Sequence, residues 1–116
     1  YLLYSYARAS SVLKKARENK KKAGKKQIID LKMQEIALLK KLNEFPEIIK
    51  KANEKLAPNI IANYAYELAQ AFSEFYHECP VIGSMEELFR LELVGAFRTV
   101  MKRALELLGI DAVEEM

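Results

Sequence analysis

The stretch PNIIANYAYELAQAFSEFYHE, residues 58–78, decides the fold. Five of its large side chains fall within an arc of roughly 80° when successive residues turn by about 100°, as in an α-helix. These residues are Ile61, Tyr64, Leu68, Phe72 and Phe75. Pro58 suits the first turn of a helix, and Pro80 and Gly83 interrupt the chain after it. The pattern predicts a long helix that presents one apolar face to the core.

The segments that precede this stretch have similar periodicity. Residues 1–17 and 31–45 read as two helices, and Asp30 is a plausible N-cap for the second. The apolar face of that second helix would consist of Leu31, Ile36, Leu39 and Leu42. Pro46 then suits the start of a short third helix that ends before Pro58.

A last helix follows the break at Gly83. Ser84 and Glu87 have the spacing of a capping box, and Gly109 is a natural terminator. Its broad apolar face comprises Phe89, Leu93, Val94, Phe97, Val100, Met101, Ala104, Leu105 and Leu108. No segment alternates with the period of a strand. We therefore predict an all-α fold, an antiparallel bundle of about five helices that forms a single domain over residues 1–116.

Composition restricts the class of protein. The chain has 116 residues, of which 51% are hydrophobic and 30% charged, as is typical of a soluble helical domain. No apolar run approaches the roughly 20 residues that span a bilayer, so we expect a cytoplasmic protein without membrane contact. The chain starts at Tyr1 without a methionine, which suggests a fragment of a longer protein.

Charge is distributed unevenly along the chain. Residues 1–55 carry 15 Lys and Arg against six Asp and Glu, whereas residues 56–116 carry four against ten. A basic N-terminal half suits a polyanion, although it also suits a solvated surface. The lysine-rich residues 18–27 have little apolar periodicity, and we predict a mobile loop there, either solvated or attracted to phosphate.

Groups for catalysis are missing from the sequence. His77 and Cys79 are the only histidine and cysteine, which excludes an internal disulfide and a Cys/His zinc cluster. No Gly-rich phosphate loop or Ser/His/Asp set is present. We read Glu86 and Glu87 as capping residues rather than an acid/base pair. We therefore expect no catalytic residue, no metal site and no cofactor within this domain.

Four positions are candidates for contact with a nucleic acid. Tyr4 and Arg8 are four residues apart, which places an aromatic ring and a guanidinium on one helical face. Such a pair suits an unstacked nucleotide, because the ring stacks on the base and the guanidinium holds a phosphate; it also suits ordinary packing. Tyr76 lies roughly 40° beyond the apolar arc of its helix, where one ring face can stay wet. Arg90 falls inside an apolar face, where it would form an ion pair or reach a ligand.

Three motifs in order resemble one family. YLLYSYAR at residues 1–8, NYAYELAQAFSEFYHECPV at 63–81 and RLELVGAFRTVMKRALELLGIDAVEEM at 90–116 are similar to segments of the DALR anticodon-binding domain at the C-terminus of arginyl-tRNA synthetases. EFPEII at 44–49 also matches a turn of that family. The resemblance omits the basic stretch at 18–27. The tail, Val113 to Met116, departs from the family's usual ending by carrying an acidic residue in place of a basic one.

The resemblance implies a function and a set of site residues. It implies that Tyr4, Arg8, Tyr76 and Met116 line the surface that faces the anticodon loop. Tyr1 and Arg90 complete our set of RNA-binding candidates. The implied partners are the anticodon loop of arginine tRNA and an upstream catalytic domain in the same chain, which uses ATP with Mg; neither DNA nor a membrane is implied. The alternatives are a helical protein-interaction module and the DALR domain of another class I synthetase, such as the cysteinyl enzyme. A free-standing hydrolase or transferase would need catalytic groups that the sequence lacks.

Overall fold

The computed structural model describes residues 1–19, 31–84 and 86–111, and these form five helices without a strand. The helices are α1 (Leu2–Asn19), α2 (Met33–Asn43), α3 (Phe45–Lys55), α4 (Pro58–Glu78) and α5 (Glu87–Leu107). Only Glu44 separates α2 from α3. The prediction of an all-α bundle of about five helices is confirmed.

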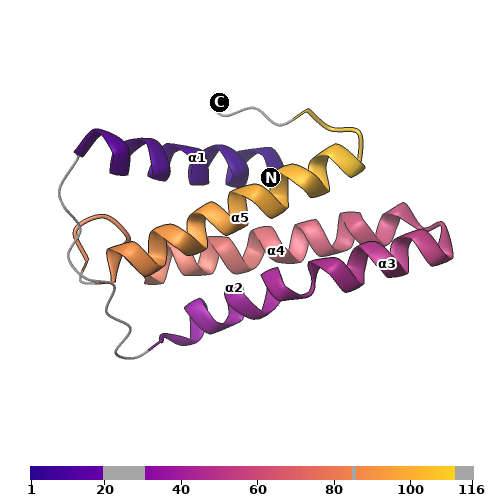
Figure 1. The fold of residues 1–116 in the computed structure, drawn as a ribbon, viewed down its shortest axis with the longest axis horizontal. Coiled ribbons are helices and arrows are strands. Elements are labelled where there is room, and N and C mark those ends of the chain that lie inside the picture. The colour runs from indigo at the N-terminus through magenta and orange to yellow at the C-terminus, as the bar shows by residue number, and fades with distance from the viewer. Residues whose placement is uncertain (20–30, 85, 112–116) are drawn as a thin grey trace.

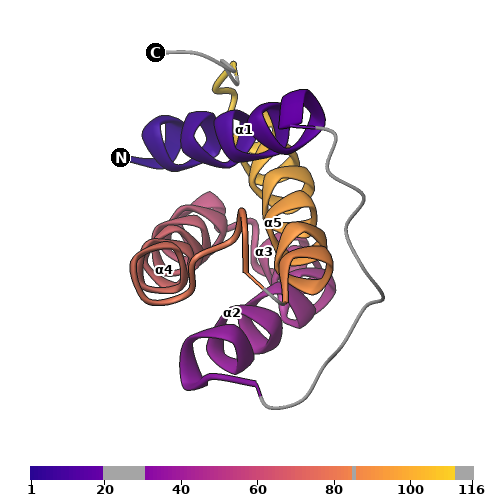
Figure 2. The same cartoon turned by 90° about the vertical axis from the view of Figure 1, so that its left-hand side faces the viewer.

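The helices pack around α4 and α5 (Figures 1 and 2). α5 runs antiparallel to both α1 and α4, and α1 lies on the opposite side of this pair from α2 and α3. α1 makes most of its contacts with α5, whereas α2 and α3 pack mainly on α4. α4 is therefore in contact with all four other helices.

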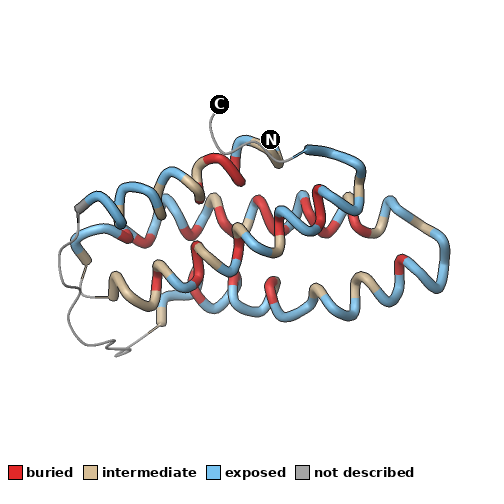
Figure 3. The backbone as a smooth tube through the Cα atoms, turned by 45° about the horizontal axis from the view of Figure 1, so that its top comes forward, coloured by how far each residue is buried: buried red, intermediate tan, exposed pale blue. Residues whose placement is uncertain are grey.

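The core is centred on α4 and α5, along which buried residues recur (Figure 3). All five residues that the helical wheel placed inward on α4 are buried, as that pattern predicted. The rings of Phe72 and Phe97 stack with centroids 4.0 Å apart and join the two helices. Burying such aromatic rings provides most of the free energy that holds a small bundle together.

α2 differs from the prediction in start and face. The N-cap is Lys32, whose backbone N–H donates to Glu35 Oε1 at 2.9 Å. The predicted cap, Asp30, lies outside the described residues. Leu38 and Leu42 are buried, whereas Ile36 and Leu39 are more than one-third exposed. The buried face of α2 differs from the predicted one because Glu35 points inward and forms an ion pair with Arg90. The periodicity argument had assigned Glu35 to the polar face.

α5 begins without the predicted capping box. Ser84 Oγ donates to the carbonyl of Val81 at 2.8 Å, and the Glu87 carboxylate accepts from the N–H of Gly83 at 2.9 Å. Both side chains therefore stabilise the preceding turn instead of the helix. The predicted end is correct, since Gly109 has a φ of 75° directly after the last turn of α5.

The lysine-rich segment is mostly outside the described residues. α1 continues to Asn19 and so includes the first two positions of the predicted loop. Residues 20–27 are not described, and the prediction of a mobile loop there stays a prediction.

Candidate nucleic-acid interface

Tyr4, Arg8 and Tyr76 meet on the surface where α1 crosses the C-terminal half of α4. Arg8 Nη2 donates to the hydroxyl of Tyr4 at 2.8 Å. The guanidinium carbon lies 4.7 Å from the centroid of the Tyr4 ring and 4.5 Å from that of the Tyr76 ring. The cation thus contacts two rings from different helices, an arrangement that favours a fixed position for all three side chains.

α1 is held in place by contacts with α5. Tyr6 and Ala9 on its inner face are buried. Arg98 of α5 donates through Nε to Ser10 Oγ at 2.8 Å, and its guanidinium carbon lies 5.1 Å from the centroid of the Tyr6 ring. Because Tyr4 and Arg8 lie on the other side of the same helix, these contacts determine which way the two residues face.

Both rings of the cluster are partly exposed to solvent. Tyr4 is 51% exposed and Tyr76 is 36% exposed. Tyr76 is backed by Phe72 of the core, with ring centroids 6.3 Å apart. A tyrosine ring that is packed against the protein on one side and is partly exposed to solvent loses little conformational entropy when a base stacks on it. The cluster is therefore a suitable stacking platform.

Two grooves adjoin this platform. The first has a volume of about 310 Å³, and its walls include Tyr4, Arg8 and Ser11. The second has a volume of about 400 Å³ and extends to the turn after α4, with Pro80 and Ile82 in its walls. Both grooves are lined by Val12, Lys15 and Tyr76. Tyr76 and Lys15 thus stand between them.

The structure adds residues that the sequence reasoning missed. Ser11 and Lys15 are three and seven positions after Arg8, so the helical stripe that identified Tyr4 and Arg8 also passes through them. Extending that stripe by two turns would have identified Lys15. The contribution of Pro80 and Ile82 had no local signal, because it depends on where the turn after α4 lies relative to α1.

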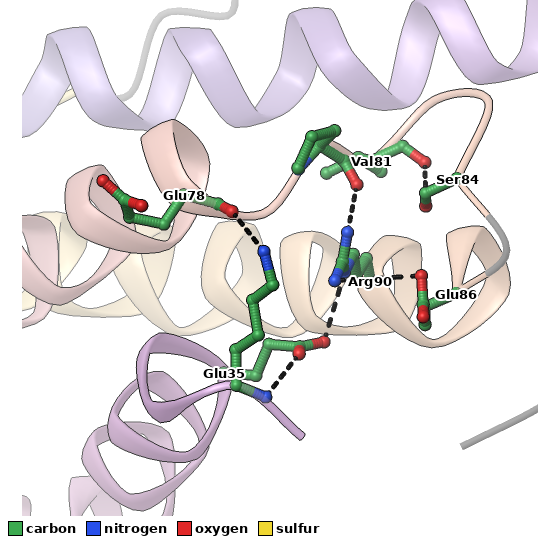
Figure 4. A network of polar contacts seen from close by, with 8 residues as sticks. Glu35, Glu78, Val81, Ser84, Glu86 and Arg90 are labelled. Atoms are coloured by element: carbon green, nitrogen blue, oxygen red, sulfur yellow. Dashed lines mark hydrogen bonds and ion pairs between the residues drawn. The ribbon is translucent and has the colours of Figure 1, made fainter. Parts of the chain in front are cut away.

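Arg90 lies in the interior of the bundle. Its side chain is 5% exposed, and its Nε lies 3.3 Å from Oε2 of Glu35, whose side chain has no exposed surface. Nη1 donates to the carbonyl of Pro80 at 2.6 Å. The guanidinium is therefore occupied by protein partners in the interior, including the ion pair that was one of the two predicted roles of Arg90. Its inclusion among the residues that touch RNA stays a prediction. Figure 4 shows the arrangement.

Of the two remaining candidates, only Tyr1 is among the described residues, and it lies apart from the platform. Tyr1 is 59% exposed, and its ring packs against Tyr66 of α4 with centroids 5.5 Å apart. Neither residue lines the grooves described above. Met116 lies outside the described residues. The structure thus brings together three of the six candidates.

Cys79 and His77 do not form a nucleophilic pair. Cys79 is fully buried, and burial, with a smaller contribution from the charge of Glu35, raises the pKa of its thiol. His77 packs edge-on against Tyr76 with ring centroids 5.5 Å apart. Within the described residues, no cluster of acidic, histidine and cysteine side chains has the arrangement of a metal site. None of the helices described has the length and apolar character needed to cross a membrane.

The chain matches one protein family over almost all of its length. A family model described as the DALR anticodon binding domain matches residues 2–116. The arginine–tRNA ligases of Methanoregula boonei and Clostridium acetobutylicum are 42% and 40% identical to it, and each alignment includes the whole chain. The chain spans only 20% and 21% of those two proteins.

Solved structures agree with this match. The arginyl-tRNA synthetase of Thermus thermophilus contains a similar domain, with a TM-score of 0.87 and 32% sequence identity. The comparison includes all of this chain and 21% of that protein. The agreement of sequence motifs, fold and family model leads to one conclusion: the chain belongs to the DALR anticodon binding domain family.

Proposed function

We propose that this chain is the anticodon-binding part of an arginyl-tRNA synthetase and that it binds the anticodon loop of arginine tRNA. The observation that carries the proposal is the cluster of Tyr4, Arg8 and Tyr76 beside two grooves. Bases that leave the stack of a single-stranded loop commonly stack on exposed tyrosines, while nearby cations bind the phosphates. Arg8 and Lys15 would supply those cations, and Met116 would complete the surface from the chain end.

The chemistry would be performed elsewhere in the parent protein. The relatives compared above are about five times as long as this chain, which leaves room for a catalytic domain. We infer that such a domain precedes Tyr1, uses ATP with Mg and attaches arginine to the tRNA in the cytoplasm. The domain described here would contribute binding and orientation, without a cofactor of its own. Neither DNA nor a membrane is part of this proposal.

Two alternatives are weaker. The DALR domain of a cysteinyl enzyme would have the same fold, but the relatives compared above are named for arginine. A protein-interaction module would not require two tyrosines and two cations around adjoining grooves. A gel-shift titration with arginine tRNA and with an unrelated tRNA separates these functions. Equal affinity for both RNAs, appearing only above about 100 μM, would indicate the non-specific binding that basic proteins show.

The platform is tested by removing one ring at a time. Tyr76→Ala and Tyr4→Ala should each weaken the binding of arginine tRNA by about 1 to 3 kcal/mol, the contribution of one base–aromatic stack. Tyr66→Ala is the matched control, because Tyr66 is 52% exposed on the same helix as Tyr76 but lines neither groove described above. Circular dichroism should show an unchanged helical fold. Wild-type affinity in both Tyr76→Ala and Tyr4→Ala would refute the platform.

The cations are tested by the dependence of affinity on salt. Arg8→Ala and Lys15→Ala should each reduce the slope of log K against log salt by about 0.7, the value for one phosphate of a single strand. Lys50→Ala, on the exposed surface of α3, should leave the slope unchanged. An equal reduction in all three variants would show that only net charge matters.

A further inference from the structure

The turn after α4 is held by hydrogen bonds to three of its carbonyl groups. Lys32 Nζ of the α2 N-cap donates to the carbonyl of Glu78 at 3.0 Å. Arg90 Nη1 donates to the carbonyl of Pro80 at 2.6 Å, and Ser84 Oγ donates to that of Val81 at 2.8 Å. Carbonyls at the end of a helix lack intrahelical partners and attract cations. Side chains of α2 and α5 thus fix the end of α4 from outside the helix.

Arg90 is the centre of this network, as Figure 4 shows. Its guanidinium lies between the turn and Glu35. A second carboxylate, that of Glu86, lies 3.8 Å from Nη2. Glu35 in turn accepts the backbone N–H of Lys32 through its other oxygen. A buried arginine with these partners has a single favoured orientation. Any other orientation would leave the Glu35 carboxylate unpaired in the interior.

The same turn forms part of the second groove. Pro80, Val81 and Ile82 line that groove together with Tyr76 and Lys15. The main chain at Pro80 therefore bonds to Arg90 while residues of the same turn face the groove. The bond between Arg90 and Pro80 is thus one of the contacts that hold this wall beside the Tyr76 ring.

We propose that Arg90 is a positioning residue for RNA binding: without touching RNA, it sets the shape of the second groove by holding the turn at Pro80. This proposal rests on the proposed function. An arginine is required because its planar fork donates in several directions at once, to the Glu35 carboxylate and to the Pro80 carbonyl. A lysine has one ammonium group and cannot reproduce this geometry.

The test compares Arg90→Lys with a variant that weakens the core elsewhere, both measured under conditions in which the unfolded fraction is equally small. Arg90→Lys keeps the charge next to Glu35 but removes the planar guanidinium that bonds to Glu35 and Pro80 together. Arg90→Gln replaces it as the test variant if the lysine variant does not fold. Met101→Ala is the control, because Met101 is fully buried on the same helix, roughly 16 Å further along it at about 1.5 Å per residue. Each variant is examined by NMR in the free state and by titration with arginine tRNA at several salt concentrations.

The expected result has three parts. In free Arg90→Lys, the amide signals of residues 77–79 and 81–83 shift while those of α3 stay in place. Affinity for arginine tRNA falls about tenfold, as displacement of a supporting wall would cause. The salt slope keeps its wild-type value, because no phosphate contact is lost. In Met101→Ala, measured where the unfolded fraction is equally small, the affinity remains that of the wild type.

Other results overturn the proposal in distinct ways. A salt slope reduced by about 0.7 would show that Arg90 touches phosphate itself. An equal loss of affinity in Met101→Ala would show that general destabilisation is the cause, and wild-type affinity in Arg90→Lys would show that the groove tolerates movement of the turn. If wild-type protein does not bind arginine tRNA, the proposed function fails; unshifted signals of residues 77–79 and 81–83 in free Arg90→Lys would then separately refute the positioning of the turn.

Discussion

At the scale of single residues, Cys79 links the turn after α4 to the stability of the fold. Burial raises the pKa of its thiol, so the folded protein keeps a proton that the unfolded chain releases above its ordinary pKa of about 8.5. Deprotonation therefore favours the unfolded chain. The free energy of unfolding should be flat below that pH with respect to this group and should fall above it, by at most about 1.4 kcal/mol per pH unit.

Urea unfolding between pH 7 and 9.5 measures this effect. Cys79→Ala removes the thiol, so the fall between pH 8.5 and 9.5 should disappear in that variant. Tyr64 also has a raised pKa because it is buried, but its ordinary pKa of about 10, which applies in the unfolded chain, lies above this pH range, so its contribution there is small. If Cys79→Ala loses stability with pH as steeply as the wild type, the thiol is not the responsible group.

Single residues also show what sequence alone can identify in the site. Tyr4 and Arg8 were found because four positions along a helix bring side chains together whatever the rest of the fold does. Tyr76 was found from its place at the edge of an apolar arc. For Arg90, a helical wheel showed only that a cation lies inward, and this left both an ion pair and a contact with a ligand open. Its partner Glu35 is 55 positions away in the chain, and no local pattern links the two.

At the scale of elements, α3 is followed by a C-cap residue whose conformation is unfavourable for a side chain. Leu56 has φ and ψ of 49° and 45°, in the left-handed region, and it is 88% exposed. A side chain there costs about 1 kcal/mol that glycine avoids, and no burial compensates. Leu56→Gly should therefore stabilise the protein by about 1 kcal/mol and raise Tm by roughly 4 °C.

Thermal unfolding followed by circular dichroism gives this value directly. Leu56→Ala keeps Cβ and should stay within about 0.5 kcal/mol of the wild type. A gain of the same size in the alanine variant would mean that removing an exposed leucine is stabilising by itself. RNA affinity should not change in either variant, since Leu56 lines neither of the grooves beside Tyr76.

Helix interiors were predicted better than helix starts, for a physical reason. The apolar faces of α4 and α5 were correct because burial of a periodic face dominates the packing of a long helix. The N-terminal cap predicted at Ser84 depended on short-range hydrogen bonds, and other short-range hydrogen bonds within the preceding turn replaced them. Ser84 and Glu87 bonded to the turn of Val81 and Gly83 instead. The inward position of Glu35 similarly rotated the face of α2.

At the scale of the whole molecule, the bundle brings a basic and an acidic half of the sequence together. Residues 1–55 carry a net charge of +9 and residues 56–116 carry −6. α1 supplies Arg8 and Lys15 to the grooves, whereas α4 supplies the ring of Tyr76 rather than charge. Phosphate attraction would therefore come from α1 and base stacking from both helices. An RNA loop would have to approach where the two helices cross.

This division leads to a prediction for the parent enzyme. If a catalytic domain elsewhere in that protein performs aminoacylation, the Tyr76 ring contributes only to tRNA binding. Tyr76→Ala in the full-length enzyme should lower kcat/KM for arginine tRNA by about 5-fold to 150-fold, which corresponds to about 1 to 3 kcal/mol of lost stacking. The KM values for arginine and ATP should keep their wild-type values, because the proposed function assigns both substrates to a domain outside this one.

Steady-state aminoacylation with each substrate varied in turn tests this expectation. Tyr66→Ala is again the control and should leave all three parameters unchanged. A loss confined to KM for tRNA would indicate that the ring contributes equally to the ground state and the transition state; a loss in kcat as well would indicate that anticodon binding helps to orient the acceptor end. Raised KM values for arginine or ATP in Tyr76→Ala would contradict the separation of binding from chemistry, because the substitution would then have disturbed the catalytic domain.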